Sequence, residues 1–156
     1  MDRDERFDED EWARLVALPR HVADALFAVS SHHPAALHRE AHAAGMAITH
    51  PHEDGPAGAL ISAILASSDG EGQLEAAIEH EVVDDPATLR ADALDALRAA
   101  TPLLARLTDE ERTGLRHWLL GVGEAEAGGA PERRADELIS TRERDELTEI
   151  AEILGG

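Results

Sequence analysis

The chain contains no cysteine, no lysine and no tyrosine, and only two tryptophans and two phenylalanines among its 156 residues. The absence of cysteine excludes disulfides, thiolate zinc sites, iron–sulfur clusters and cysteine nucleophiles. The absence of lysine excludes Schiff-base catalysis and a phosphate-binding loop that depends on a lysine. Several large classes of enzymes and cofactor proteins are therefore excluded by composition.

Long hydrophobic runs are also missing. The longest nearly apolar stretch, residues 57–66, is about half of the roughly 20 residues that a membrane helix needs. Residues 1–6 lack the apolar segment of a signal peptide. The sequence therefore predicts no membrane span and a cytoplasmic location.

Basic charge is scarce. The 14 basic residues, all of them arginine, stand against 33 acidic ones, and the formal net charge is −19. Such a surface repels phosphate backbones and anionic lipid, so nucleic acids and membranes are not expected as partners. Arginine-only basicity indicates a high-GC genome, whereas the acidic excess also suits adaptation to high salt. The composition leaves both explanations open.

Apolar residues recur at helical spacing, and no stretch alternates with a period of two for long enough to predict a strand. We predict one all-α domain over residues 1–156, a bundle of about seven or eight helices around a single core. Residues 1–8 are expected to form a flexible acidic N-terminus. Residues 49–58 and 128–139, where glycine and proline gather, are predicted to be loops.

Several helix starts are marked by capping residues. The acidic residues 8–11 suit a helix N-terminus because carboxylates there oppose the positive end of the helix dipole. Asp85 followed by Pro86 predicts an N-cap and a first helical residue. Residues 108–111 and 140–143 both have the form of a capping box, with a hydroxyl residue three positions before a glutamate.

Helix ends are predicted from proline and glycine. Pro19 is expected to separate the first helix from the second, and Pro102 to end the helix that starts after Asp85. A helix that opens at His33 is expected to run toward Gly45, because glycine favours a helix C-terminus.

Two predicted helices share the same apolar spacing: Val22, Leu26 and Val29 in the first, and Leu115, Leu119 and Val122 in the second. Each is followed by a loop and then by a helix with an early glutamate, Glu40 or Glu143. The pattern predicts a weak internal duplication.

This arrangement resembles the tellurite-resistance TerB-like helical proteins, which include the N-terminal domain of a membrane-anchored J-domain co-chaperone; the likeness covers roughly residues 12–45 and 108–156. In that family the loop typically contains Asp-Gly, and acidic residues have been linked to metal binding. Here the loops at 30–33 and 123–126 lack Asp-Gly, which leaves Glu40 and Glu143 as the matching acidic positions. The resemblance implies a stress-related binding or scaffold role.

The main candidate for chemistry is a histidine cluster, because six of the nine histidines lie between His32 and His52. His38 and His42 are four residues apart, so on a helix their rings share one face and can chelate one ion. A flanking group would have to supply the third ligand, and imidazole favours zinc, nickel or copper. The candidate metal ligands are His38, His42, His33, His50, His52 and Glu53. The other interpretation is a set of exposed histidines beside a loop.

Searches for catalytic motifs find none. Residues 38–42 read His-Arg-Glu-Ala-His, which is not the His-Glu-x-x-His of zinc peptidases, and no glutamate has a histidine three residues on. There is no Gly-x-Ser-x-Gly and no complete dinucleotide fingerprint. His117 is interpreted as a residue of a helix face, and Trp12 and Trp118 as core anchors.

The sequence therefore predicts a non-catalytic, cytoplasmic helical binding or assembly protein. A protein partner or a second copy of the chain is expected, and no nucleic acid or membrane. The alternative is a transition-metal-binding protein or a metal-dependent enzyme that uses the histidines of residues 32–52.

Overall fold

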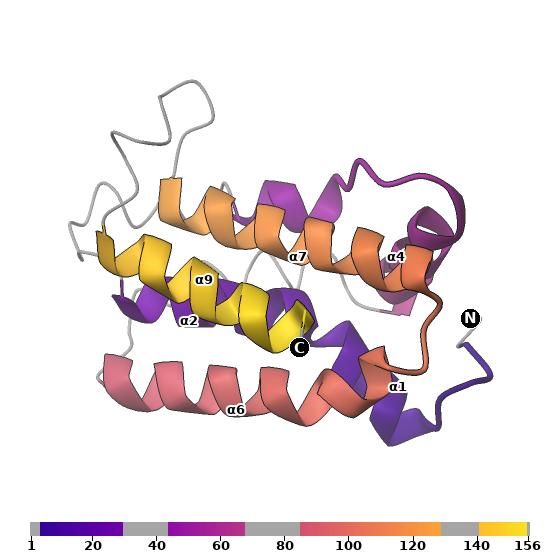
Figure 1. Cartoon of the computed structure of the whole chain (residues 1–156), viewed down its shortest axis with the longest axis horizontal. Coiled ribbons are helices and arrows are strands. Elements are labelled where there is room, and N and C mark those ends of the chain that lie inside the picture. Colours follow the sequence, from indigo (N-terminus) through magenta and orange to yellow (C-terminus); the bar gives the residue numbers. More distant parts are fainter. Residues whose placement is uncertain (1–3, 30–43, 68–84, 129–140, 156) are drawn as a thin grey trace.

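The computed structural model describes residues 4–29, 44–67, 85–128 and 141–155, and within these ranges every regular element is a helix. Residues 44–49 form a short helical segment. The longer helices are α1 (Glu9–Val16), α2 (Leu18–Val29), α4 (Gly55–Ser67), α6 (Pro86–Leu104), α7 (Asp109–Gly128) and α9 (Thr141–Gly155). The predicted all-α bundle is confirmed (Figure 1).

Helix α2 lies at the centre of the bundle. Ten of its twelve residues are buried, as expected of a helix covered on all sides. It packs against α6, α7 and α9, and α4 packs against α7. Figure 1 shows α7, α9 and α6 side by side with α2 behind them. Trp12 and Trp118 are buried, as predicted for core anchors.

The predicted starts of α1, α6 and α7 are confirmed by their hydrogen bonds. Asp8 accepts the Glu11 amide at 2.8 Å, and the Glu11 carboxylate accepts the Asp8 amide at 2.9 Å. Asp85 caps α6, with Pro86 as the next residue. The box at residues 108–111 closes through bonds of 2.9 and 3.2 Å. Ser140, at the start of the last predicted box, lies outside the described residues.

Two predicted helix ends are wrong. Pro102 lies inside α6, which continues to Leu104. Proline removes one backbone donor there, but Leu103 and Leu104 are buried, and their burial outweighs the missing hydrogen bond. The chain also stays helical beyond Gly45, through Thr49, whereas the preceding residues 30–43 lie outside the described part.

The predicted loops are only partly observed. Residues 50–54 are non-helical, and α4 already begins at Gly55, whose φ of +66° is a left-handed conformation that favours glycine. Of the loop predicted at 128–139, Gly128 is the last residue of α7, and the remainder lies outside the described residues.

Within residues 1–8, which we predicted to be a flexible acidic N-terminus, Phe7 is packed into the core, whereas Glu5, Arg6 and Asp8 are exposed. Phe7 is only 2% exposed and belongs to the core. Its ring centroid lies 6.3 Å from that of Trp12, and the guanidinium of Arg106 stacks 4.7 Å from it. In a chain with two phenylalanines, burying this ring stabilises the fold by roughly 2 kcal/mol.

The starts of α1 and α7 are joined by reciprocal ion pairs. Arg6, two residues before the cap of α1, donates to both carboxylate oxygens of Glu111 on α7 at 2.7 and 2.8 Å. Arg106, two residues before the cap of α7, donates to Glu11 on α1 at 2.8 Å. Each segment thus contacts the other through the same kind of residues, as two copies related by a two-fold axis would.

The reciprocal contacts show how residues 6–29 align with residues 106–128 within the chain. The interval is 100 residues, from Arg6 to Arg106, and differs from the predicted alignment of Val22 with Leu115. Matched pairs that are buried in both segments include Phe7 with Leu107, Leu15 with Leu115, Leu18 with Trp118, and Val22 with Val122. The two helices α1 and α2 thus correspond to the single helix α7.

Candidate functional site

Half of the predicted metal ligands can be placed. His33, His38 and His42 lie outside the described residues. His50 follows the helical segment 44–49, and its Nδ1 lies 3.1 Å from the carbonyl oxygen of Met46. His52 is exposed, and its backbone N–H donates to Glu53. In the part of the chain that the structure describes, no three histidine or acidic side chains are arranged to hold a metal ion.

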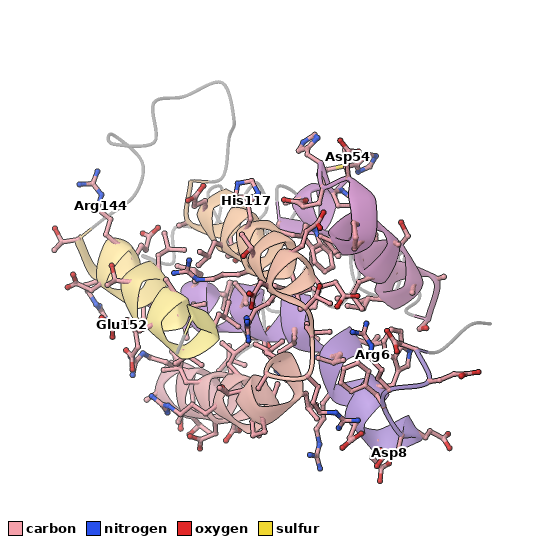
Figure 2. The ribbon with its side chains drawn as sticks, turned by 45° about the vertical axis from the view of Figure 1, so that its right-hand side comes forward. Arg6, Asp8, Asp54, His117, Arg144 and Glu152 are labelled. Atoms are coloured by element: carbon pink, nitrogen blue, oxygen red, sulfur yellow. The ribbon has the colours of Figure 1, made fainter. Side chains whose placement is uncertain are left out.

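Glu53 has a partner that the sequence did not indicate. Its side chain is 10% exposed, and its Oε1 lies 2.5 Å from Nδ1 of His117, which is 81% exposed. The next residue of α7, Trp118, donates from Nε1 to the carbonyl of Ala47 at 3.2 Å. His117 lies on an exposed helix face, as predicted, but it also helps to fasten residues 47–53 to α7. Figure 2 shows His117 on α7 and Asp54 at the same edge of the molecule.

A shallow acidic hollow of about 430 Å³ lies between α4 and the start of α7. Four carboxylates line it: Glu53, Asp54, Asp109 and Glu110. The two helices approach each other closely at Gly114, since a Cβ added there would lie only 2.2 Å from that of Ala57. The hollow is therefore strongly negative and narrow at its base.

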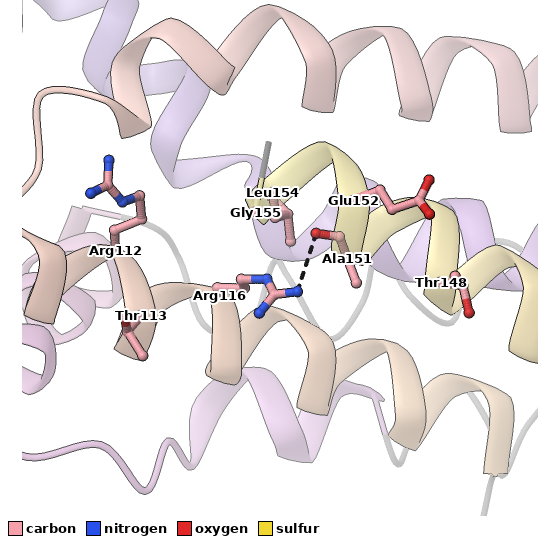
Figure 3. A pocket seen from close by; sticks show the side chains of 8 residues that line it. All are labelled: Arg112, Thr113, Arg116, Thr148, Ala151, Glu152, Leu154 and Gly155. Carbon is pink, nitrogen blue, oxygen red and sulfur yellow. Dashed lines mark hydrogen bonds between the residues drawn. The ribbon is translucent and has the colours of Figure 1, made fainter.

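A second, larger groove of about 760 Å³ lies beside it on α7, against α9, and shares Thr113 with the hollow. Arg112, Thr113 and Arg116 line it from α7, and Figure 3 shows Arg116 reaching toward α9. The facing residues include Thr148, Ala151 and Glu152. The volume falls within the range of small-ligand sites. Two guanidinium groups and two hydroxyl groups thus line an open groove in a protein whose net charge is −19.

The two arginines differ in their partners. Arg112 forms an ion pair with Asp109, one turn earlier on α7. Arg116 donates to the carbonyl of Ala151 at 3.4 Å (Figure 3), near the C-terminal end of α9, where the negative end of the helix dipole favours a cation. Among the described residues Arg116 has no ion pair with a carboxylate. Its guanidinium is therefore a positive group of the groove that no described carboxylate neutralises.

Several carboxylates are buried. From the sequence, the acidic residues were predicted to be exposed to solvent or to cap helix starts. The buried acids of the described ranges are Asp24, Glu111, Glu126, Glu143 and Glu146. Burial raises the pKa of Glu146 even though Arg90 donates to it at 2.8 Å. Glu143, one of the two acidic positions named by the family resemblance, is among them, and Glu40 lies outside the described residues. The sequence did hold a signal for the burial of Glu146, because this residue lies four positions before the core residue Ile150 and therefore on the same face of the helix.

Within the described ranges, no helix combines the length and apolar character needed to cross a membrane. No protein-family model, curated protein or solved structure matches this chain. Of the two hollows that flank α7, the α7–α9 groove is the larger and the one that arginines line.

Proposed function

We propose that this chain is a non-catalytic binding or assembly protein that docks a protein partner in the α7–α9 groove, with the cytoplasm as its location. The observation that carries the proposal is Arg116, which lines a groove of about 760 Å³ and has no ion pair with a carboxylate among the described residues. A cation in this position attracts an anionic group of a partner, since guanidinium binds carboxylates in two-pronged geometry.

The chemistry of the groove supports binding rather than catalysis. Guanidinium stays protonated at any physiological pH, so Arg112 and Arg116 do not exchange protons with a substrate. The hydroxyls of Thr113 and Thr148 have no histidine among the residues that line the groove to activate them. The resemblance to TerB-like proteins supports the same kind of role and adds a link to stress.

Site-specific cross-linking tests this proposal. A photoreactive residue replaces Thr148 in the groove or, as the control, Asp92 on the exposed face of α6. In cells, the Thr148 probe is expected to give adducts of defined mass that the Asp92 probe does not. Excess unlabelled chain should compete for them. Equal adduct patterns from both positions would contradict docking in the groove.

A second copy of the chain is one candidate partner. Light scattering on purified protein over a range of concentrations distinguishes it from a foreign protein. A dimer that the Arg116→Gln substitution weakens would identify the partner as another copy. A monomer that still gives Thr148 adducts would identify a different protein.

Transition-metal binding is the second candidate function. It is supported by the four-residue spacing of His38 and His42 and by the neighbouring His50 and His52. Glu53, the carboxylate candidate, already pairs with His117. Elemental analysis of untagged protein is expected to find zinc, nickel or copper in stoichiometric amount, and His38→Ala to remove it. Metal-free protein whose melting temperature is unchanged by added Zn²⁺ or Ni²⁺ would eliminate this function.

A further inference from the structure

The residues that line the α7–α9 groove indicate the kind of partner segment that occupies it, on the basis of the proposed docking function. We infer that the occupant is an extended acidic segment of a protein partner, with glutamate or aspartate side chains next to an apolar one. Its carboxylate binds Arg116, and its backbone N–H groups bind the opposite side of the groove. Three observations support this assignment.

The first observation is charge. Several of the described arginines pair with carboxylates across the fold, as Arg6 does with Glu111 and Arg90 with Glu146. Arg116 instead binds only a backbone carbonyl at 3.4 Å, a long hydrogen bond that a carboxylate would replace at little cost. Arg112, one turn away, also lines the groove, but its guanidinium already pairs with Asp109.

The second observation is the mixed character of the groove. Glu152 lines the α9 side, opposite the arginines. A phosphate group brings mainly acceptor oxygens to a groove that also holds the carboxylate of Glu152. A peptide carries both kinds of group, because its acidic side chains suit Arg116 and its amides suit Glu152 and Thr148. Ala151, between them, offers an apolar contact.

The third observation is the difference between the two matched segments. At the interval of 100 residues, Arg112 and Arg116 correspond to Trp12 and Val16. Trp12 is buried and donates to Ser67 on α4, and Val16 packs partly against the core. In the second segment the same positions carry cations and line an open groove. The chain thus fills this surface by itself in one segment and leaves it accessible and charged in the other.

The test uses the purified full-length chain and synthetic peptides. The probe is an acetylated, fluorescently labelled decapeptide with a Glu-Leu-Glu core in Gly-Ser flanks, and its control carries Gln-Leu-Gln. Anisotropy titration is expected to show binding of the glutamate peptide, about tenfold weaker binding of the glutamine peptide, and an affinity that falls with added salt. Equal binding of the two peptides, or full competition by inorganic phosphate, would overturn the inference.

Variants connect the peptide to the groove. Arg116→Gln is expected to weaken binding of the glutamate peptide about tenfold. Arg98→Gln, which removes an exposed arginine of α6, should leave it unchanged. Gly155→Ala keeps every charge and places a Cβ 3.0 Å from Nε of Arg116, so the guanidinium must shift slightly and binding should weaken less than in Arg116→Gln. Equal effects of Arg116→Gln and Arg98→Gln would overturn the inference, and thermal melts check that each variant is folded.

The outcome is separable from that of the proposed function. If Thr148 cross-links a partner that the glutamate peptide does not displace, docking in the groove stands and the acidic occupant is wrong. If Thr148 gives no specific adduct, the docking function itself fails.

Discussion

The two segments 6–29 and 106–128 have the same beginning and different surfaces. Each has an arginine, a buried apolar residue, an N-cap and a glutamate in the same order, and each arginine binds the glutamate of the other segment. Beyond this shared frame, α2 of the first segment is buried by its own chain, whereas α7 of the second carries a groove and, beside it, an acidic hollow. The frame therefore serves stability, and the departures from it are where function is expected.

We expect the two segments to differ most in the effect of an alanine substitution on the free energy of unfolding at the matched positions 14 and 114. Arg14 is exposed, whereas a Cβ at Gly114 would lie 2.2 Å from that of Ala57. Gly114→Ala would force α4 and α7 apart, because the Ala57 Cβ is fixed to its backbone. We expect it to lower the free energy of unfolding by about 2–3 kcal/mol, measured by urea denaturation. Arg14→Ala should change it by less than about 0.5 kcal/mol. Similar losses in the two variants would show that the α4–α7 contact is looser than described.

The reciprocal ion pairs provide the next comparison. The Glu111 side chain is 11% exposed and accepts two bonds from Arg6, whereas that of Glu11 is 25% exposed and accepts one bond from Arg106. Each also closes a capping box. We expect Glu111→Ala to cost about 2 kcal/mol and Glu11→Ala about 1 kcal/mol in urea unfolding. A larger loss for Glu11→Ala would contradict this order.

The same glutamate gives a pH dependence. The hydrogen bonds from Arg6 hold the pKa of Glu111 below its ordinary value of 4.5. A carboxyl whose pKa is lower in the folded state stabilises the fold fully above pH 4.5, and this contribution is lost as the pH falls below that value. The difference in unfolding free energy between wild type and Glu111→Ala should therefore shrink between pH 6 and pH 3. An unchanged difference would argue against the ion pair with Arg6.

A smaller effect of opposite sign is expected at Gly121, the counterpart of His21. A Cβ at Gly121 meets nothing within 4 Å. Because glycine weakens a helix interior, Gly121→Ala should raise the free energy of unfolding by about 0.5–1 kcal/mol. Thermal melting measures the gain, and a loss of stability would mean that this surface of α7 is covered.

The smallest expected effect is at His21 itself. Burial lowers its pKa below the ordinary value of 6.5, outweighing the attraction of Asp24. The neutral ring is therefore favoured in the fold, and its contribution to stability is lost as the pH falls below 6.5. His21→Gln should lose less stability than wild type between pH 7.5 and pH 5.5. Parallel pH profiles for the two proteins would contradict this burial effect.

Features set by neighbouring residues could be predicted from the sequence. The capping boxes at Asp8 and Thr108 and the N-cap at Asp85 depend on side chains within three residues of the backbone they bind. The helical period likewise predicted the burial of Leu115 and Val122. Local chemistry of this kind does not depend on the rest of the fold.

Features set by packing between distant segments could not be predicted. Pro102 stays inside α6, and Phe7 joins the core, because the burial of neighbouring side chains overrides a local preference. Glu53 and His117 are 64 positions apart, and only the packing of α4 on α7 brings them together. The groove, likewise, requires Arg116 to meet the C-terminal end of α9. The sequence instead predicted a site at the histidine cluster of residues 32–52.

The crossed pairs Arg6–Glu111 and Arg106–Glu11 also govern how the bundle opens. Each glutamate closes the first turn of its own helix and is held by an arginine that precedes the other helix. Fraying at either start therefore releases a partner from the opposite start, so we expect the two turns to exchange their amide hydrogens as one cooperative unit. Matching protection of the Glu11 and Glu111 amides is the expected signature. Helix ends, usually the first parts of a protein to loosen, are here tied to each other across the fold.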